Sequence, residues 1–345
     1  MLFDNSSRLL VSLTSQGKIV ALPDENVDGK ADKTITLLEN LRKPHGLALS
    51  CEGSAGVQQC KLLVAEEHQV VAYTYDQGSP RATNPKKIID LPTKGGGHFT
   101  RTLLIIDTPE GKKLLTSIGS SCNVCIEEDQ RRAAIYISNL DGSNFKPYVT
   151  GLRNSVFMAV HPVTKKVWAT EMGRDLLGDN VPPEEVNIIE QEKNYGWPIC
   201  YDSNIHDTQF DKNKYIQDPC GDKLAPHIKM QAHSAPLGLA FVPDDLNHTG
   251  KNNRTESWPL DWKNDLFIAY HGSWNRSVPT GYKIVRYDLD DEGNVIGVND
   301  FLSGFLKPDN KSAYGRPVDV LTLPGGYMYV SDDHAGNIYR IQYVE

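Results

Sequence analysis

The chain has 345 residues, enough for two or three average domains or for one large repeat-built or barrel-type domain. Its 36 basic and 44 acidic residues give a net charge of −8, which argues against a nucleic-acid-binding protein because such proteins carry a basic surface. A hydrophobic content of 39% excludes wholesale disorder. The longest apolar runs have the length of a strand and fall short of the roughly 18 residues that a membrane helix needs, so we expect no membrane-spanning segment.

The cysteines lie along the chain as three close pairs: Cys51 and Cys60, Cys122 and Cys125, Cys200 and Cys220. This grouping predicts three local disulfides and an oxidising compartment, extracellular or periplasmic. The alternatives are unrelated buried thiols or, at 122–125, a zinc or redox motif, but no second such motif and no histidine pair lies near it. Met1 leads straight into a polar stretch, so we expect that an export signal was removed or was not included.

The predicted elements are short strands that recur in modules. A half module at 9–22 is followed by fuller modules that begin near residues 44, 97, 153, 235 and 315. The first three begin about 50–55 residues apart, which is typical of propeller blades, and the later gaps hold insertions near 171–232 and 243–264.

This spacing predicts an all-β protein in which residues 1–345 form one domain, a six-bladed β-propeller of four-stranded antiparallel blades. No opening strand is recognisable before residue 9, so blade one can be incomplete at the N-terminus. A β-sandwich is the alternative, but it would not explain the spaced modules.

Propellers place function where the first strands of the blades converge. A polar residue opens each of five modules: His45, His98, Arg153, His233 and Arg316. Because they hold equivalent positions in the repeat, we expect them to cluster near the axis.

Two of these module openings indicate chemistry. Three glycines at 95–97 let the backbone approach a ligand closely, and His98 after them can act as a general base near neutral pH. Arg153, followed by Asn154, places a fixed positive charge that could pair with an anionic ligand or stabilise developing charge. The structural alternatives are a histidine in a tight turn and an arginine that bonds carbonyls between blades.

The insertion after residue 171 is dense in oxygen donors and in residues that favour irregular backbone, beginning with Gly173, Arg174 and Asp175. Hard cations such as Ca²⁺ bind carboxylates and carbonyls in loops of this kind. Tyr195 and Trp197 follow, and we expect them to be exposed and able to stack on a flat ligand or a sugar.

These segments together resemble the soluble quinoprotein glucose and sorbosone dehydrogenase family, six-bladed propellers that use pyrroloquinoline quinone (PQQ). Further motifs follow in family order at 233–241, 271–276, 281–283, 301–305, 315–317 and 331–333. The resemblance covers about residues 17–343, and the segments 174–180 and 271–276 look closer to the sorbosone-dehydrogenase-like branch than to the bacterial glucose enzymes.

The resemblance implies a PQQ- and Ca²⁺-dependent dehydrogenase that oxidises an aldose or a related sugar at C1. His98 matches the base that removes the proton from the C1 hydroxyl while hydride passes to C5 of PQQ. Arg153 matches the arginine that stabilises the negative charge developing on the quinone oxygen. PQQ carries three negative charges and therefore needs cations, a metal and a slot lined by aromatic side chains. The positive charges of the predicted site residues fit this need.

The resemblance also implies a set of cofactor contacts. The carbonyls of Gly173 and Arg174 match the pair that binds Ca²⁺, with Asp175 beside them, and Arg316 matches an arginine that pairs with a PQQ carboxylate. The other expected cofactor contacts are Asn154, Tyr195, Trp197, His233, Arg276 and Lys283.

The chain departs from the family at three positions. Arg174 replaces a proline, a mild change because a carbonyl ligand does not need proline, and Val156 replaces a glutamine that contacts cofactor or sugar. Ser120 replaces the aspartate that orients the base. Serine cannot stabilise an imidazolium as a carboxylate does, so either another acid substitutes or activity is lower.

Two other functions stay open. A catalytically silent propeller that binds a sugar or a protein partner would fit the change at Ser120. A Ca²⁺-dependent lactonase shares the six-bladed shape, but it would want several carboxylates around one metal and gives no reason for Arg153 and Arg316. For the dehydrogenase, the expected partners are a sugar and a soluble or membrane electron acceptor, a quinone or a cytochrome.

Overall fold

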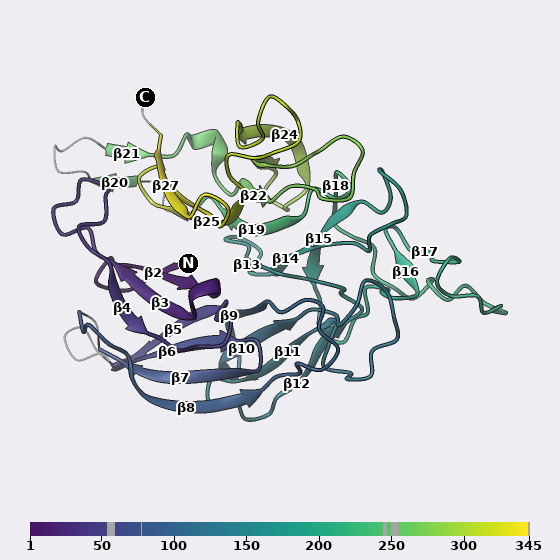
Figure 1. Ribbon diagram of the computed structural model, residues 1–345, viewed down its shortest axis with the longest axis horizontal. Coiled ribbons are helices and arrows are strands. Elements are labelled where there is room, and N and C mark those ends of the chain that lie inside the picture. Colours follow the sequence, from purple (N-terminus) through teal and green to yellow (C-terminus); the bar gives the residue numbers. More distant parts are fainter. Residues whose placement is uncertain (54–58, 77, 244–246, 250–254, 344–345) are drawn as a thin grey trace. The chain divides into compact units, whose positions relative to one another are not determined.

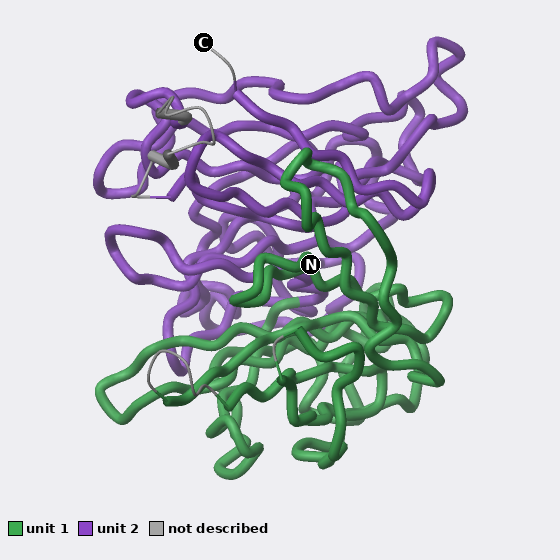
Figure 2. The backbone as a smooth tube through the Cα atoms, turned by 90° about the vertical axis from the view of Figure 1, so that its left-hand side faces the viewer, with its two compact units in different colours: residues 1–152 green, residues 153–345 purple. Residues whose placement is uncertain are grey.

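The computed structural model describes residues 1–53, 59–76, 78–243, 247–249 and 255–343. Within them, regular structure is almost entirely β, with 3-10 turns at Thr14–Gln16 and Leu260–Trp262. None of the helices described is long and apolar enough to cross a membrane. The chain divides into two compact units, Met1–Leu152 and Arg153–Glu345 (Figure 2).

Unit 1 consists of three four-stranded antiparallel sheets (Figure 1). Each is built from consecutive strands: β1 (Leu2–Phe3), β2 (Leu9–Leu13), β3 (Lys18–Leu22) and β4 (Ile35–Leu38); β5 (Leu47–Glu52), β6 (Gln59–Glu66), β7 (Gln69–Tyr75) and β8 (Thr83–Asp90); β9 (Arg101–Thr108), β10 (Gly111–Ile118), β11 (Ala134–Asn139) and β12 (Lys146–Thr150).

Unit 2 repeats this pattern with longer connections. Its three main sheets are β13 (Met158–Val160), β14 (Val167–Glu171), β15 (Glu184–Ile189) and β18 (Ile228–Met230); β19 (Pro236–Phe241), β22 (Leu266–Tyr270), β23 (Lys283–Leu289) and β24 (Val295–Leu302); β25 (Pro317–Leu323), β26 (Tyr327–Asp332) and β27 (Asn337–Gln342). Two small hairpins, β16 (Cys200–Tyr201) with β17 (Ile205–His206) and β20 (Asn247–Thr249) with β21 (Thr255–Ser257), lie in the two predicted insertions.

The six main sheets match the predicted modules, and the prediction of a six-bladed β-propeller is confirmed. Two details differ from the expected pattern. The opening strand that was not recognisable in blade one is present as β1, but it has two residues. The last sheet has three strands in the described residues.

The middle strands of the sheets explain the continuous apolar runs in the sequence. On β6, Leu62 and Val64 pack into one core cluster while Leu63 and Ala65 pack into another. Because successive side chains of a strand point to opposite faces, a strand with both faces buried is apolar throughout. β22 behaves alike, with Leu266 and Ile268 in one cluster and residues 267 and 269 in the next.

All three predicted disulfides are present. Cys51 and Cys60 face each other across β5 and β6. The bond between residues 122 and 125 closes a short loop after β10, and the bond between 200 and 220 closes a larger loop in the first insertion. The described residues contain no free cysteine, so residues 122–125 offer no thiolate for the alternative of a zinc site.

Candidate functional site

In unit 1, His98 lies in the loop before β9 and contacts Ser120. Its backbone N–H donates to Ser120 O over 3.0 Å, and its ring Nδ1 lies 3.0 Å from Ser120 Oγ and 3.2 Å from Ser120 O. Gly97 makes this approach possible, since it has a φ of 69° and an added Cβ would lie 2.4 Å from the backbone of Ser121. Ser120 therefore holds the imidazole through both its hydroxyl and its backbone carbonyl.

Two buried arginines brace the loop that carries His98. Arg101 is fully buried and donates to the carbonyls of His98, Thr100 and Pro92 over 2.8–2.9 Å. Arg132 donates to Gly119 O, Lys94 O and the same Pro92 O, each over 3.2 Å. Burial, and then the charge of Arg132, lower the pKa of Arg101 to about 10, so the guanidinium stays charged at neutral pH. Neither arginine had a predicted role, because a sequence does not show which backbone carbonyls need a side-chain donor.

His45 also opens a strand of unit 1, but its surroundings disfavour charge. Its Nδ1 lies 3.3 Å from both Arg101 O and Thr102 Oγ1. Burial is the main cause that lowers the pKa of His45 to about 4, and the charge of Arg101 adds to it. His45 is therefore neutral at physiological pH and fits a structural role.

Acidification is expected to destabilise the protein through His45. Because its pKa falls from 6.5 to about 4 on folding, the folded state binds the proton less tightly than the unfolded state. This contribution to stability is complete above pH 6.5 and is lost as the pH falls towards 4. Between pH 7 and pH 5, the urea midpoint of the parent protein should therefore fall relative to that of His45→Gln, because the other titrating groups respond alike in both proteins. An equal change in both proteins would contradict the assignment, and the exposed His334→Gln is the matched control.

In unit 2, a chain of polar contacts joins three predicted site residues. Arg153 donates to Asp175 Oδ2 over 2.9 Å, and Asn275 Nδ2 donates to Asp175 Oδ1 over 2.8 Å. Asn275 Nδ2 also lies 3.3 Å from His233 Nδ1, while His233 Nε2 lies 2.7 Å from Gly178 O. Arg153 and His233 are nearly fully buried. The structure thus links the two through Asp175 and through Asn275, which the sequence analysis missed.

Further contacts join the loop after β14 to the loop after β22. Arg276 donates to Asn180 Oδ1 over 3.1 Å and to Ala232 O over 3.2 Å, and Ser277 N donates to Asp179 Oδ1 over 3.1 Å. The two loops lie about a hundred residues apart in the chain. These hydrogen bonds hold the backbone around the predicted cation-binding segment, which has no regular secondary structure.

The predicted Ca²⁺ segment lies among buried carboxyl groups. Gly173 N donates to Glu184 Oε2 over 2.8 Å, and Asn154 N donates to Glu171 Oε1 over 2.9 Å. Burial raises the pKa of Glu184 to about 8 and that of Glu171 well above its ordinary value. The Arg174 side chain forms an ion pair with Asp207, which leaves only its backbone to serve as the predicted ligand.

Arg316 opens the last sheet and reaches the same loop as Asn275. Its Nε donates to His271 O over 3.1 Å, an Nη donates to Gly272 O, and its guanidinium lies 5.3 Å from the centre of the Tyr282 ring. Within unit 2, the residues that open the modules are therefore connected through the loop 271–276.

Two predicted cofactor contacts form hydrogen bonds with other residues of the chain, and a third is half-buried. Lys283 donates to Asp300 Oδ1 over 2.6 Å, on the neighbouring strand β24. Tyr195 is buried and its hydroxyl donates to Ile188 O over 2.5 Å, so the expectation of an exposed tyrosine is wrong. Trp197 is half-buried. Trp274 has a large exposed surface, with a relative exposure of 72% for the residue, and no role was predicted for it.

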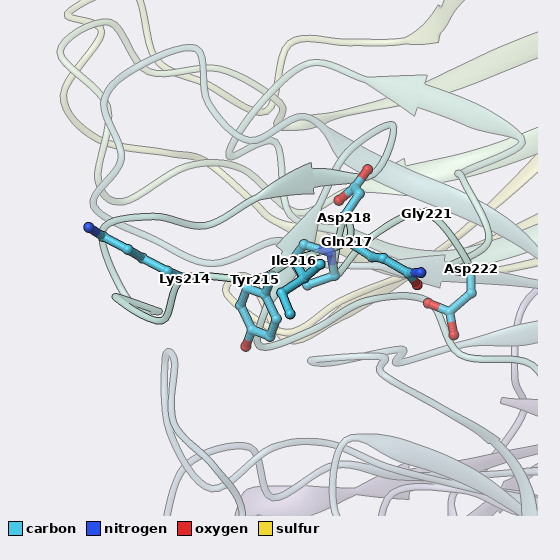
Figure 3. Close-up of a pocket in the computed structure, with 8 residues that line it drawn as sticks. Lys214, Tyr215, Ile216, Gln217, Asp218, Gly221 and Asp222 are labelled. Atoms are coloured by element: carbon cyan, nitrogen blue, oxygen red, sulfur yellow. The ribbon is translucent and has the colours of Figure 1, made fainter.

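A pocket in the first insertion involves none of these residues (Figure 3). One segment lines it, at 214–219, 221 and 222. Most of this segment belongs to the loop that the disulfide between residues 200 and 220 closes, and the pocket is open at the surface. Its lining includes the carboxyl groups of Asp218 and Asp222, but it contains no residue of the predicted site.

Comparison with known proteins identifies the family. The TrAA12-like family matches residues 1–344, and the chain belongs to it. An uncharacterised protein of Borreliella burgdorferi is 38% identical over 256 residues, 73% of this chain and 63% of that protein. A pyrroloquinoline quinone-dependent pyranose dehydrogenase of Coprinopsis cinerea is 24% identical over 402 aligned positions, 98% of this chain and 51% of that protein. The chain thus spans between half and two thirds of these relatives.

A solved structure agrees with the fold. The calcium structure of the Trichoderma reesei enzyme of carbohydrate-active family AA12 superposes with a TM-score of 0.77, at 22% identity, over 98% of this chain and 91% of that one. At this identity the likeness shows that the fold is shared. Family and fold together confirm the resemblance to PQQ-dependent sugar dehydrogenases.

Proposed function

We propose that the protein is a PQQ- and Ca²⁺-dependent dehydrogenase that oxidises an aldose or a related sugar at C1. The observation that carries the proposal is the contact of His98 with Ser120, which holds the ring at Nδ1. The sequence resemblance assigns the role of the base to the same residue. A neutral imidazole with its proton on Nδ1 has its basic lone pair on Nε2. Such a group can take the proton of a sugar hydroxyl.

The donors of unit 2 fit the implied cation. Two buried oxygens, Asn154 Oδ1 and Glu171 Oε2, accept no hydrogen bond in the part of the chain that the structure describes. They lie beside the predicted segment, since Asn154 O accepts from Met172 N over 3.3 Å. Buried oxygens without donors suit a hard cation. Ca²⁺ would be held by such oxygens together with the carbonyls of Gly173 and Arg174, with Asp175 nearby.

The cations of unit 2 fit an anionic cofactor. Arg276 Nε is buried and has no acceptor among the described residues, so it suits a carboxylate. Arg316 would supply a second guanidinium, and Arg153 would stabilise negative charge while Asp175 fixes its orientation. PQQ, when bound, would supply the two-electron acceptor for the hydride from C1. The other predicted contacts, Tyr195 and Lys283, would influence the shape of the site through their hydrogen bonds to Ile188 and Asp300.

Reconstitution tests the proposal. Incubation with PQQ and Ca²⁺ is expected to give bound PQQ, seen as a change in its absorption spectrum, and reduction of an electron-accepting dye with at least one aldose of a panel. Chelation of Ca²⁺ should weaken PQQ binding. A protein that binds no PQQ under these conditions is not a quinoprotein, and a protein that binds PQQ but oxidises no sugar is a silent member of the family.

The alternative functions find less support. In the described residues, the one group of His, Cys, Asp and Glu side chains close enough to share a metal ion is Cys122, Cys125 and Glu127, and its two cysteines form a disulfide. A lactonase would need a carboxylate cluster instead. The interpretation as a silent propeller rests on Ser120, whose hydroxyl lies 3.0 Å from Nδ1 of His98.

We further propose that the enzyme works as a single propeller domain outside the reducing cytoplasm. Three disulfides support this compartment. A quinone or a cytochrome would then accept the electrons.

A further inference from the structure

We propose that Ser120 fixes His98 in the tautomer with its proton on Nδ1, and that the Cys122–Cys125 disulfide loop keeps Ser120 in place to do so. The role of His98 as a base rests on the proposed function. The position of its proton does not, because it follows from the contacts of unit 1 alone.

The contacts of Nδ1 decide which nitrogen of the neutral His98 ring carries the hydrogen. Ser120 O is a carbonyl oxygen, 3.2 Å from Nδ1, and can only accept. Ser120 Oγ, 3.0 Å from Nδ1, has one proton, which it donates to Cys122 O over 2.6 Å. Both oxygens therefore present lone pairs to Nδ1, and Nδ1 must carry the hydrogen. The neutral ring is left with its lone pair on Nε2.

The hydroxyl keeps its orientation because its acceptor is fixed. Cys122 O belongs to the four-residue loop that the disulfide to Cys125 closes. Ser120 is fully buried, so water does not compete for its hydroxyl. On the other side, Arg132 donates to Gly119 O over 3.2 Å and His98 N donates to Ser120 O over 3.0 Å. The disulfide loop thus acts through Cys122 O and Ser120 Oγ on His98, and both are positioning groups rather than catalytic ones.

A serine in this position differs from a carboxylate in one respect that can be measured. Either group accepts the Nδ1 hydrogen and fixes the tautomer, but only a carboxylate also stabilises the imidazolium. The Ser120→Asp variant should therefore keep the tautomer and make His98 titrate at higher pH than in the parent protein. Ser120→Ala should instead shift the neutral ring towards the Nε2–H tautomer.

Long-range ¹H–¹⁵N NMR of the histidine rings, in protein without PQQ, tests the placement directly. His98 is assigned by the loss of its signals in His98→Gln. Above its titration range, the parent protein should show a protonated Nδ1 and an unprotonated Nε2. Ser120→Ala should lower the Nδ1–H population. The matched control is Ser121→Ala, because the Ser121 hydroxyl donates to Glu127 over 2.7 Å and its loss should leave the His98 tautomer unchanged.

Two results would overturn the proposal. One is a parent protein with the proton on Nε2, which needs no variant to observe. The other is a His98 tautomer that Ser120→Ala does not change. The double variant Cys122→Ser/Cys125→Ser tests the loop: it should lower the Nδ1–H population in the same direction, and an unchanged population would remove the disulfide from the proposal.

Kinetics separate positioning from binding. In the loaded enzyme, Ser120→Ala should lower kcat by about five- to tenfold, the effect of one neutral hydrogen bond, while KM changes little. A reduced kcat with an unchanged tautomer would overturn the proposal, since the loss would then have another cause. A protein with the expected tautomer but no sugar oxidation would contradict the proposed function and support the placement of the proton.

Discussion

His98→Ala is expected to lower kcat for aldose oxidation by about two to four orders of magnitude, the usual contribution of a general base. The reason is that removal of the imidazole leaves water to take the proton of the C1 hydroxyl. PQQ should still bind, because the proposed cofactor contacts do not include His98. The measurement is dye reduction at saturating sugar, together with a PQQ titration of the same preparation.

The control for this variant is His334→Ala. The side chain of His334 is exposed, and the contact that the structure gives it uses its backbone N–H, which donates to Asp332 over 3.0 Å. Full activity is expected there. A His98→Ala protein that keeps the parent rate would show that another group removes the proton, and PQQ binding lost in this variant would place His98 at the cofactor instead.

The fold was predictable because its signals are local. Runs such as residues 62–65 are apolar throughout, as a strand between two cores must be, and they recur with the spacing of blades. The two-residue strand β1 was not predictable, since Leu2 and Phe3 form no run and acquire their partners only by pairing with Leu10 and Leu9. Strand length at the edge of a sheet depends on tertiary contacts that the sequence does not display.

The candidate site was predictable as a set of residue types and not as a set of contacts. His98, Arg153 and Arg316 stand at module openings, which the repeat indicates. The carboxylate that orients Arg153 lies 22 residues away, and Asn275 lies 100 residues from the same Asp175. Such pairings depend on how the loops fold back.

Ser120 is a second case in which the residue type did not predict the contacts. In the sequence it is a lost carboxylate, which indicated a weakened base. In the structure its hydroxyl and its carbonyl both face Nδ1 of His98, and the hydroxyl proton has its own acceptor at Cys122. The residue type shows that no carboxylate is present, but it does not show that both oxygens of Ser120 face Nδ1.

Arg101→Met should lower the free energy of unfolding by about 3 kcal/mol, since two hydrogen bonds from a charged donor are lost and each contributes about 1.5–3 kcal/mol. Methionine retains much of the side-chain volume but none of the donors. The carbonyls of His98 and Thr100 lose their bonds to Nη1, while Pro92 O keeps its bond to Arg132. Relief of the repulsion between Arg101 and Arg132 offsets part of this loss. Urea unfolding, followed by circular dichroism, gives the difference.

Arg131→Met provides the matched control, because the same substitution is made at a different burial. The Arg131 side chain is 39% exposed and pairs with Asp129, which is 33% exposed. Exposed pairs of this kind contribute about 0–1 kcal/mol, so the urea midpoint should change little. Equal losses at Arg101 and Arg131 would mean that the carbonyls of His98 and Thr100 do not depend on a guanidinium. A loss confined to Arg101 would show that its buried guanidinium stabilises the fold through the loop that carries His98.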